Sequence, residues 1–161
     1  MRDFIQQLPK VELHVHLVGS ASADTVLELA RRHPDQDVPT ERERLRAFYE
    51  FTDFAHFIEV YVKVTRLVVT GADITALIVG LARDLAANRV RYAEVTVTPV
   101  PHVMVGIEPD ELAEALNIGR RLAREQHGVE LAWVFDIAGS LGYEAGVLTA
   151  EWVLRRRWGL R

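Results

Sequence analysis

Two histidines stand two residues apart in the segment VELHVHLVGS, residues 11–20. Apolar and polar residues alternate here, so the segment predicts a strand from Val11 to Leu17 whose apolar side chains pack into a core. Side chains two apart in a strand lie on the same face, which places His14 and His16 side by side with Glu12. Two such imidazole nitrogens can bind one metal ion at about 2.0–2.1 Å. A metal site is therefore the first hypothesis, and a structural pair, hydrogen-bonded within the sheet, is the alternative.

The composition limits which chemistry is available. The chain has 161 residues, of which 49% are hydrophobic and 26% charged, as in an ordinary soluble globular domain. It has no cysteine, so any metal must be held by histidine and carboxylate groups rather than by thiolates. The net charge of -4 gives no reason to expect nucleic acid or a membrane as a partner. No secretory signal is visible, so we expect a cytoplasmic protein.

Strands and helices are expected to alternate along the chain, because stretches of period-2 hydrophobicity alternate with stretches of helical spacing. The expected strands cover residues 11–17, 90–99 and 129–139. The expected helices cover residues 22–33, 40–51, 53–68, 71–89, 108–128 and 142–158. The segment VPHVMVGIEP, after the second strand, is expected to be a loop. This order predicts an α/β fold made of parallel βαβ units with right-handed crossovers.

Polar side chains recur at the carboxyl ends of the predicted strands, where parallel α/β folds bind their ligands. The two histidines stand at this end of the first strand. Glu94 and Thr98 lie on the second strand, and Asp136 closes the third. Each carboxylate also has a structural interpretation as a buried hydrogen-bonding group, and we favour it for Glu12 and Asp136.

The segment LPKVELHVHLVGS, residues 8–20, closely resembles the first strand of the adenosine deaminase family. That family belongs to the amidohydrolase superfamily of metal-dependent TIM barrels, and its pattern is Leu-Pro-Lys, then His-x-His-Leu, an acid and glycine. VRYAEVTVTP, residues 90–99, resembles the family's second strand, and FTDFAHFIEVY, residues 51–61, resembles its helical insertion. The resemblance runs from Leu8 to about Asp136. It implies the (β/α)₃ amino-terminal portion of a TIM barrel, with a helical insertion after strand one, as a single domain over residues 1–161.

The resemblance also implies zinc-dependent hydrolytic deamination of adenosine or a related 6-aminopurine. On this interpretation His14 and His16 are zinc ligands, His16 also contacts the substrate, and Gly19 lets the backbone approach the ligand closely. The family's acid after His-Leu is replaced by Val18, which forms no hydrogen bond through its side chain. A different substrate or weakened binding at this position is the expected consequence.

The rest of the family's site lies in the later half of the barrel. A full barrel needs about 250 residues, so we expect no catalytic acid or base within this chain. A carboxyl-terminal half is expected to complete the site, through self-association or a second polypeptide, because a half-barrel exposes open strand edges. A folded but inactive remnant is the alternative. The remaining histidines match none of the family's positions; they are His33, His56, His102 and His127.

Aromatic residues are frequent in the expected helical insertion. They are Phe48, Tyr49, Phe51, Phe54 and Phe57. Their helical spacing favours packing in the core for most of them, with contacts to a bound purine for one or two.

Overall fold

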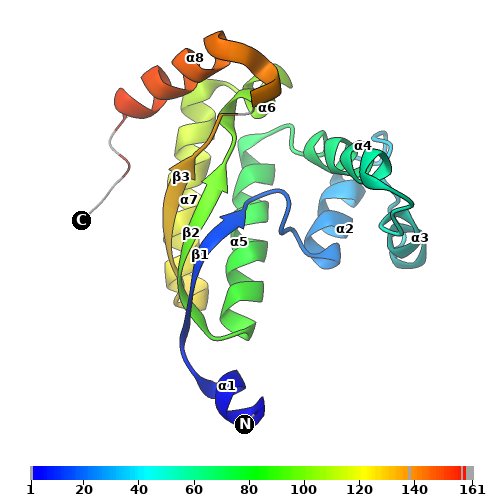
Figure 1. Ribbon diagram of the computed structural model, residues 1–161, viewed down its shortest axis with the longest axis vertical. Coiled ribbons are helices and arrows are strands. Elements are labelled where there is room, and N and C mark those ends of the chain that lie inside the picture. The colour runs from blue at the N-terminus through cyan, green and yellow to red at the C-terminus, as the bar shows by residue number, and fades with distance from the viewer. Residues whose placement is uncertain (1, 138, 157, 159–161) are drawn as a thin grey trace.

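A computed structural model describes residues 2–137, 139–156 and 158 (Figure 1). Its elements in chain order are α1 (Arg2–Gln7), β1 (Lys10–His16), α2 (Ala23–Arg32), α3 (Arg42–Phe48), α4 (Phe54–Thr65), α5 (Gly71–Ala87), β2 (Val90–Val97), α6 (Pro99–Met104), α7 (Pro109–His127), β3 (Glu130–Phe135), a 3-10 turn (Gly139–Leu141) and α8 (Gly142–Leu154). Among the helices of this described part, none has the length and apolar character that crossing a membrane requires.

The three strands form one parallel sheet in the order β1-β2-β3. Helices α5 and α7 lie side by side against one face of this sheet, whereas α2, α3 and α4 stand to one side of it (Figure 1). Helices α6 and α8 lie at the carboxyl ends of the strands (Figure 1). The α/β fold with parallel βαβ units is therefore confirmed, and the expected insertion after the first strand consists of α2, α3 and α4.

Local signals in the sequence set the boundaries of several helices. Asp53 caps α4 by accepting a hydrogen bond from the backbone N–H of His56. Thr70 and Asp73 form a reciprocal capping box at the start of α5. Helix α7 ends at Gly128, whose φ of 65° lies in the left-handed region that favours glycine. These caps satisfy backbone groups that a helix end otherwise leaves without partners.

The core fills the space between the sheet and the helix pair α5 and α7, and it continues into α2, α3 and α4. Ala93 and Val95 on β2 and Leu116 on α7 are fully buried there. The two helices approach closely at Gly119, where a Cβ atom would lie 2.5 Å from Cδ1 of Ile78. A larger residue at position 119 would push α5 and α7 apart, and the helices would then pack less well against the sheet.

Strand β1 differs from expectation, because none of its residues is fully buried. Leu17, which follows the strand, is buried, whereas Val11 and Leu13 are 63% and 62% exposed. The expectation that all the apolar residues of this strand pack into the core is therefore wrong. β1 is an edge of the sheet, and no other strand in the described part of the chain pairs with its open side.

Candidate active site

His14 and His16 meet at the carboxyl end of β1. Their Nε2 atoms are 3.2 Å apart, and their ring centroids are separated by 5.2 Å. Two nitrogens bound to one tetrahedral zinc ion lie about 3.3 Å apart, given metal–nitrogen distances of about 2.05 Å. The pair is thus already spaced as two ligands of one metal ion require. Among the residues that the structure describes, no third histidine, aspartate or glutamate joins them to form a metal-binding group.

Glu12 does not point its carboxylate at this pair as a third ligand. Its Oε1 atom accepts a hydrogen bond from the backbone N–H of His14 at 3.3 Å, and the side chain is half-buried. The pairing of β1 with β2 shifts its register between Glu12 and Val15, so strict alternation of faces does not hold through this stretch. These contacts favour the structural interpretation of Glu12.

A hollow of about 620 Å³ opens beside the histidine pair. Its lining comes from the end of β1, the loop after it and the helical insertion. The lining residues are His14, Val15, His16, Val18, Gly19, Ser20, Ala21, Tyr49, Phe51, Phe57, Ile58, Val60, Tyr61 and Val64. A cavity of this size and apolar character is typical of a small-molecule site. We call it the ligand hollow.

Aromatic rings from the insertion form one wall of the ligand hollow. Phe51 and Phe57 are 44% and 39% exposed, and their rings meet edge to face with centroids 5.3 Å apart. Phe57 in turn stacks on Tyr61. Core packing was therefore the wrong expectation for Phe51, Phe57 and the highly exposed Phe54. Helix α4 instead enters the core through Val60 and Val64, which leaves these three rings outside it.

Val18 and Gly19 both line this hollow. Val18 is almost fully buried and offers the hollow only an apolar surface. A Cβ atom on Gly19 would lie 3.5 Å from the Cβ of His16 and 3.7 Å from Cε2 of Tyr61, which are ordinary contacts. Packing within the protein therefore does not require glycine at position 19. What the missing side chain leaves open is space in the hollow beside His16.

The polar side chains along β2 and just after β2 and β3 form hydrogen bonds with one another. Tyr92 donates a hydrogen bond to Oε1 of Glu94 at 3.1 Å, and Thr98 donates one to Oδ1 of Asp136 at 2.5 Å. Burial and, to a smaller extent, the charge of Asp136 raise the pKa of the Tyr61 phenol. Asp136 therefore lies near the hollow, but its hydrogen bond supports the structural role that we favoured.

His102 is a candidate site residue that sequence reasoning missed. The segment around it was expected to be a loop, yet residues Pro99–Met104 form α6, which begins with a proline in its first turn. His102 is 3% exposed and lines a small cavity together with His16. In the sequence, His102 directly follows Pro101, just beyond the end of a strand. This position indicates a site residue only once α6 is known.

Burial lowers the pKa of His102 from its ordinary value of 6.5 to about 4. The unfolded chain thus binds a proton on this residue below about pH 6.5 while the folded chain does not, so stability falls as the pH falls through this window. We expect the free energy of unfolding to drop by about 2 kcal/mol between pH 7.5 and pH 5 from this residue. Urea unfolding of the wild type and of His102→Leu measures it.

The variant His127→Gln is the matched control for this measurement, because His127 lies at the far end of α7. It should keep the wild-type loss of stability between the two pH values, whereas His102→Leu should lack the part due to His102. Equal pH dependence in the wild type and His102→Leu would contradict the prediction.

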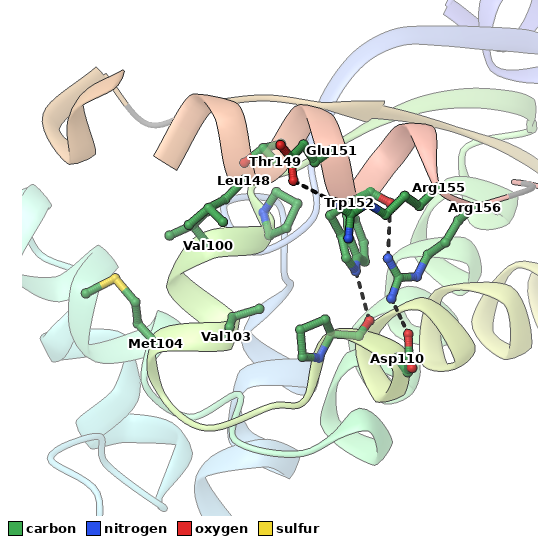
Figure 2. A pocket seen from close by; sticks show the side chains of 12 residues that line it. Val100, Val103, Met104, Asp110, Leu148, Thr149, Glu151, Trp152, Arg155 and Arg156 are labelled. Carbon is green, nitrogen blue, oxygen red and sulfur yellow. Dashed lines mark hydrogen bonds and ion pairs between the residues drawn. The ribbon is translucent and has the colours of Figure 1, made fainter. Parts of the chain in front are cut away.

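A second large hollow, of about 610 Å³, lies between α6, the start of α7 and α8 (Figure 2). Its polar side chains are paired with neighbours: Trp152 donates to the backbone carbonyl of Pro109, and Arg156 forms an ion pair with Asp110 (Figure 2). The rest of its lining is largely apolar and contains no histidine. It lacks groups arranged for chemistry, so the histidine pair and its hollow form the better candidate site.

Comparison with known proteins agrees with the geometry. The family model for adenosine deaminase matches residues 9–145. The chain belongs to the adenosine deaminase family. Aminodeoxyfutalosine deaminase of Streptomyces avermitilis is 47% identical over 96% of this chain and 42% of its own length. The enzyme of the same name from Streptomyces coelicolor is 48% identical over 92% of this chain and 38% of its own. Adenine deaminase of Caulobacter vibrioides is 30% identical.

Solved structures of the amidohydrolase superfamily match the fold. An amidohydrolase from Burkholderia ambifaria with bound zinc superimposes with a TM-score of 0.83 at 28% identity, over 97% of this chain and 43% of that one. Adenine deaminase from Arthrobacter aurescens gives a TM-score of 0.70 at 26% identity, over 91% of this chain and 46% of that one. The chain spans less than half the length of these relatives. The amino-terminal portion of a TIM barrel, as expected from the sequence, is confirmed.

Proposed function

We propose that this chain provides the amino-terminal half of a zinc-dependent deaminase for 6-aminopurine compounds. The convergence of the Nε2 atoms of His14 and His16 at 3.2 Å, on the wall of an apolar hollow, carries this proposal. Membership of the adenosine deaminase family supports it, and so does the zinc bound by the related structure from Burkholderia ambifaria. The reaction class is hydrolysis, in which water replaces an amino group and ammonia is released.

The two histidines would hold the metal through their Nε2 atoms. Zinc in such a site lowers the pKa of a bound water so that hydroxide is available near neutral pH. The other residues of this chain bind and orient the substrate: Gly19 leaves space beside His16, and the rings of Phe57 and Tyr61 give the hollow an apolar wall. The remaining metal ligands and the acid that protonates the leaving group belong to the part of the barrel outside this chain.

Aminodeoxyfutalosine is the first substrate to assay, because relatives named for it share 47% and 48% of their aligned residues with this chain. Six related adenine deaminases share 25% to 30%. The test is ammonia release from aminodeoxyfutalosine, adenosine and adenine, with zinc supplied. It is made with the purified chain alone and with the chain mixed with the carboxyl-terminal portion of the Streptomyces avermitilis relative. Absence of turnover on all three substrates in the mixture, once the two parts are shown to associate, would contradict the proposal.

A folded but inactive remnant is the second candidate, and one observation favours it. Within the described residues two ligands are present, and structural or catalytic zinc sites use at least three protein ligands. The metal content of the assembled protein separates the two candidates. Stoichiometric zinc with turnover supports the enzyme, whereas a stable assembly that binds neither zinc nor substrate supports the remnant.

Val18 gives a test of substrate choice. Val18→Asp restores the acid that the family pattern has after His-Leu, at a residue lining the ligand hollow. A new acceptor for a substrate hydroxyl contributes roughly 1–3 kcal/mol, so we expect deamination of adenosine by the assembled protein to rise at least about fivefold. Ammonia release measures this, with Val18→Leu as the apolar control. If adenosine turnover is unchanged in a folded Val18→Asp protein, Val18 does not determine substrate choice.

A further inference from the structure

A small cavity of about 120 Å³ lies behind the metal-binding histidine pair. His16, Val18 and Tyr61 line both this cavity and the ligand hollow, so their side chains form the wall between the two. The other lining residues are Leu17, Thr65, Thr96, Thr98, Pro101 and His102. We call it the rear cavity.

The two ring nitrogens of His16 differ in their contacts. Nε2 contacts His14, whereas Nδ1 has no protein partner among the described residues. Its Nε2 faces Nε2 of His14, which is the metal-binding side of the ring. Within the described residues no protein group is hydrogen-bonded to its Nδ1 atom. A metal-binding histidine almost always donates this second N–H to a carboxylate, a carbonyl or a water molecule, which fixes the tautomer and the ring orientation. His16 is exposed, so water is available as this partner.

His102 also lines the rear cavity, and it too has a ring nitrogen without a protein partner. Its Nδ1 atom is buried and has no hydrogen-bond partner in the described part of the chain. Leaving a buried polar atom unpaired costs about 1–3 kcal/mol, so such atoms are usually satisfied by protein or by ordered water. The rear cavity is large enough for water, since one molecule occupies about 30 Å³ in the liquid.

The cavity also has hydroxyl groups that can hold water in place. Thr96 is 6% exposed, and Thr98 is fixed by its hydrogen bond to Asp136. A buried water molecule typically makes about three hydrogen bonds, and the lining offers imidazole and hydroxyl groups for them. An apolar cavity of the same size would remain dry.

We propose that ordered water in the rear cavity links Nδ1 of His102 to Nδ1 of His16, and that His102 is thereby a positioning residue for this metal ligand. Water accepting the Nδ1–H of His16 holds that ring in the tautomer whose Nε2 lone pair is available to a metal. The link to metal binding rests on the proposed function, whereas the water site and the tautomer of His16 do not.

The variants His102→Leu and His102→Asn test this proposal. Leucine removes the polar partner, whereas the asparagine side chain keeps a polar atom near the position of Nδ1. We expect calorimetric zinc affinity to fall about 10- to 100-fold in His102→Leu and to recover at least in part in His102→Asn. Thermal unfolding of the metal-free proteins is the control, because a purely structural role would change stability without this pattern in zinc affinity. Equal zinc affinity in all three proteins would overturn the positioning role.

Two measurements on metal-free protein keep this test separate from the proposed function. Nitrogen NMR shifts of the His16 ring should report the Nδ1–H tautomer in the wild type and a mixture of tautomers in His102→Leu. A high-resolution crystal structure should show water density between the two imidazoles. If the wild type binds no zinc but shows both features, the proposed metal chemistry fails and the hydrated link stands. A dry rear cavity, or an unchanged His16 tautomer in the variant, would overturn the link.

Discussion

Replacing either His14 or His16 with alanine is expected to lower the zinc affinity of the chain by about 100-fold or more, beyond calorimetric detection. The reason is geometric: the two Nε2 atoms lie 3.2 Å apart, so each would supply half of the contacts that this chain makes with the proposed ion. Loss of a second-sphere partner alone costs about 10- to 100-fold, and loss of a ligand costs at least as much. Isothermal titration of zinc into the metal-free proteins measures the effect.

The control for this experiment is His127→Ala, at the end of α7 that lies remote from the carboxyl ends of the strands. It should bind zinc as the wild type does. Because both ligands act on one ion, the double variant of His14 and His16 should be little weaker than either single variant. A single alanine variant with wild-type affinity would show that the convergent Nε2 atoms are a structural pair.

The parts of this site that were predicted from the sequence depend on local geometry. The period of two along a strand is enough to bring His14 and His16 together. The expected helix boundaries at residues 53 and 128 likewise depend on a few neighbouring residues. Alternating strands and helices fix the parallel order β1-β2-β3 through the handedness of their connections. Such features follow from short-range rules.

The features that were missed depend on which distant segments pack together. His102 is buried behind His16 because α6 folds over the strand ends, and nothing near it in the sequence reports that contact. Phe54 and Phe57 have the spacing of a core-facing helix, but the residues of α4 that enter the core are Val60 and Val64. Hydrophobic periodicity shows which side chains share a face, whereas only tertiary structure decides what covers that face.

The open side of β1 is expected to be the surface on which the rest of the barrel assembles. Leu13 is 62% exposed on this edge strand, and the related structures extend well beyond the part that this chain matches. We expect the chain to associate with the carboxyl-terminal portion of the Streptomyces avermitilis relative, and two copies to associate through the same edges when that portion is absent. The variant Leu13→Glu should weaken association about 100-fold, because burying an unpaired charge costs several kcal/mol.

The matched control is Met104→Glu, which places the same charge at a 71% exposed residue on α6 instead of on the sheet edge. Both substituted side chains are exposed in the free chain, so neither variant should lower the stability of that chain. A difference in association between the two variants must therefore come from the assembled state. Light scattering measures self-association, and titration calorimetry measures binding of the second portion. A wild-type chain that stays monomeric at micromolar concentration and does not bind the second portion would contradict the prediction. So would a Leu13→Glu protein that assembles as well as Met104→Glu, because the β1 edge would then not be the surface that pairs.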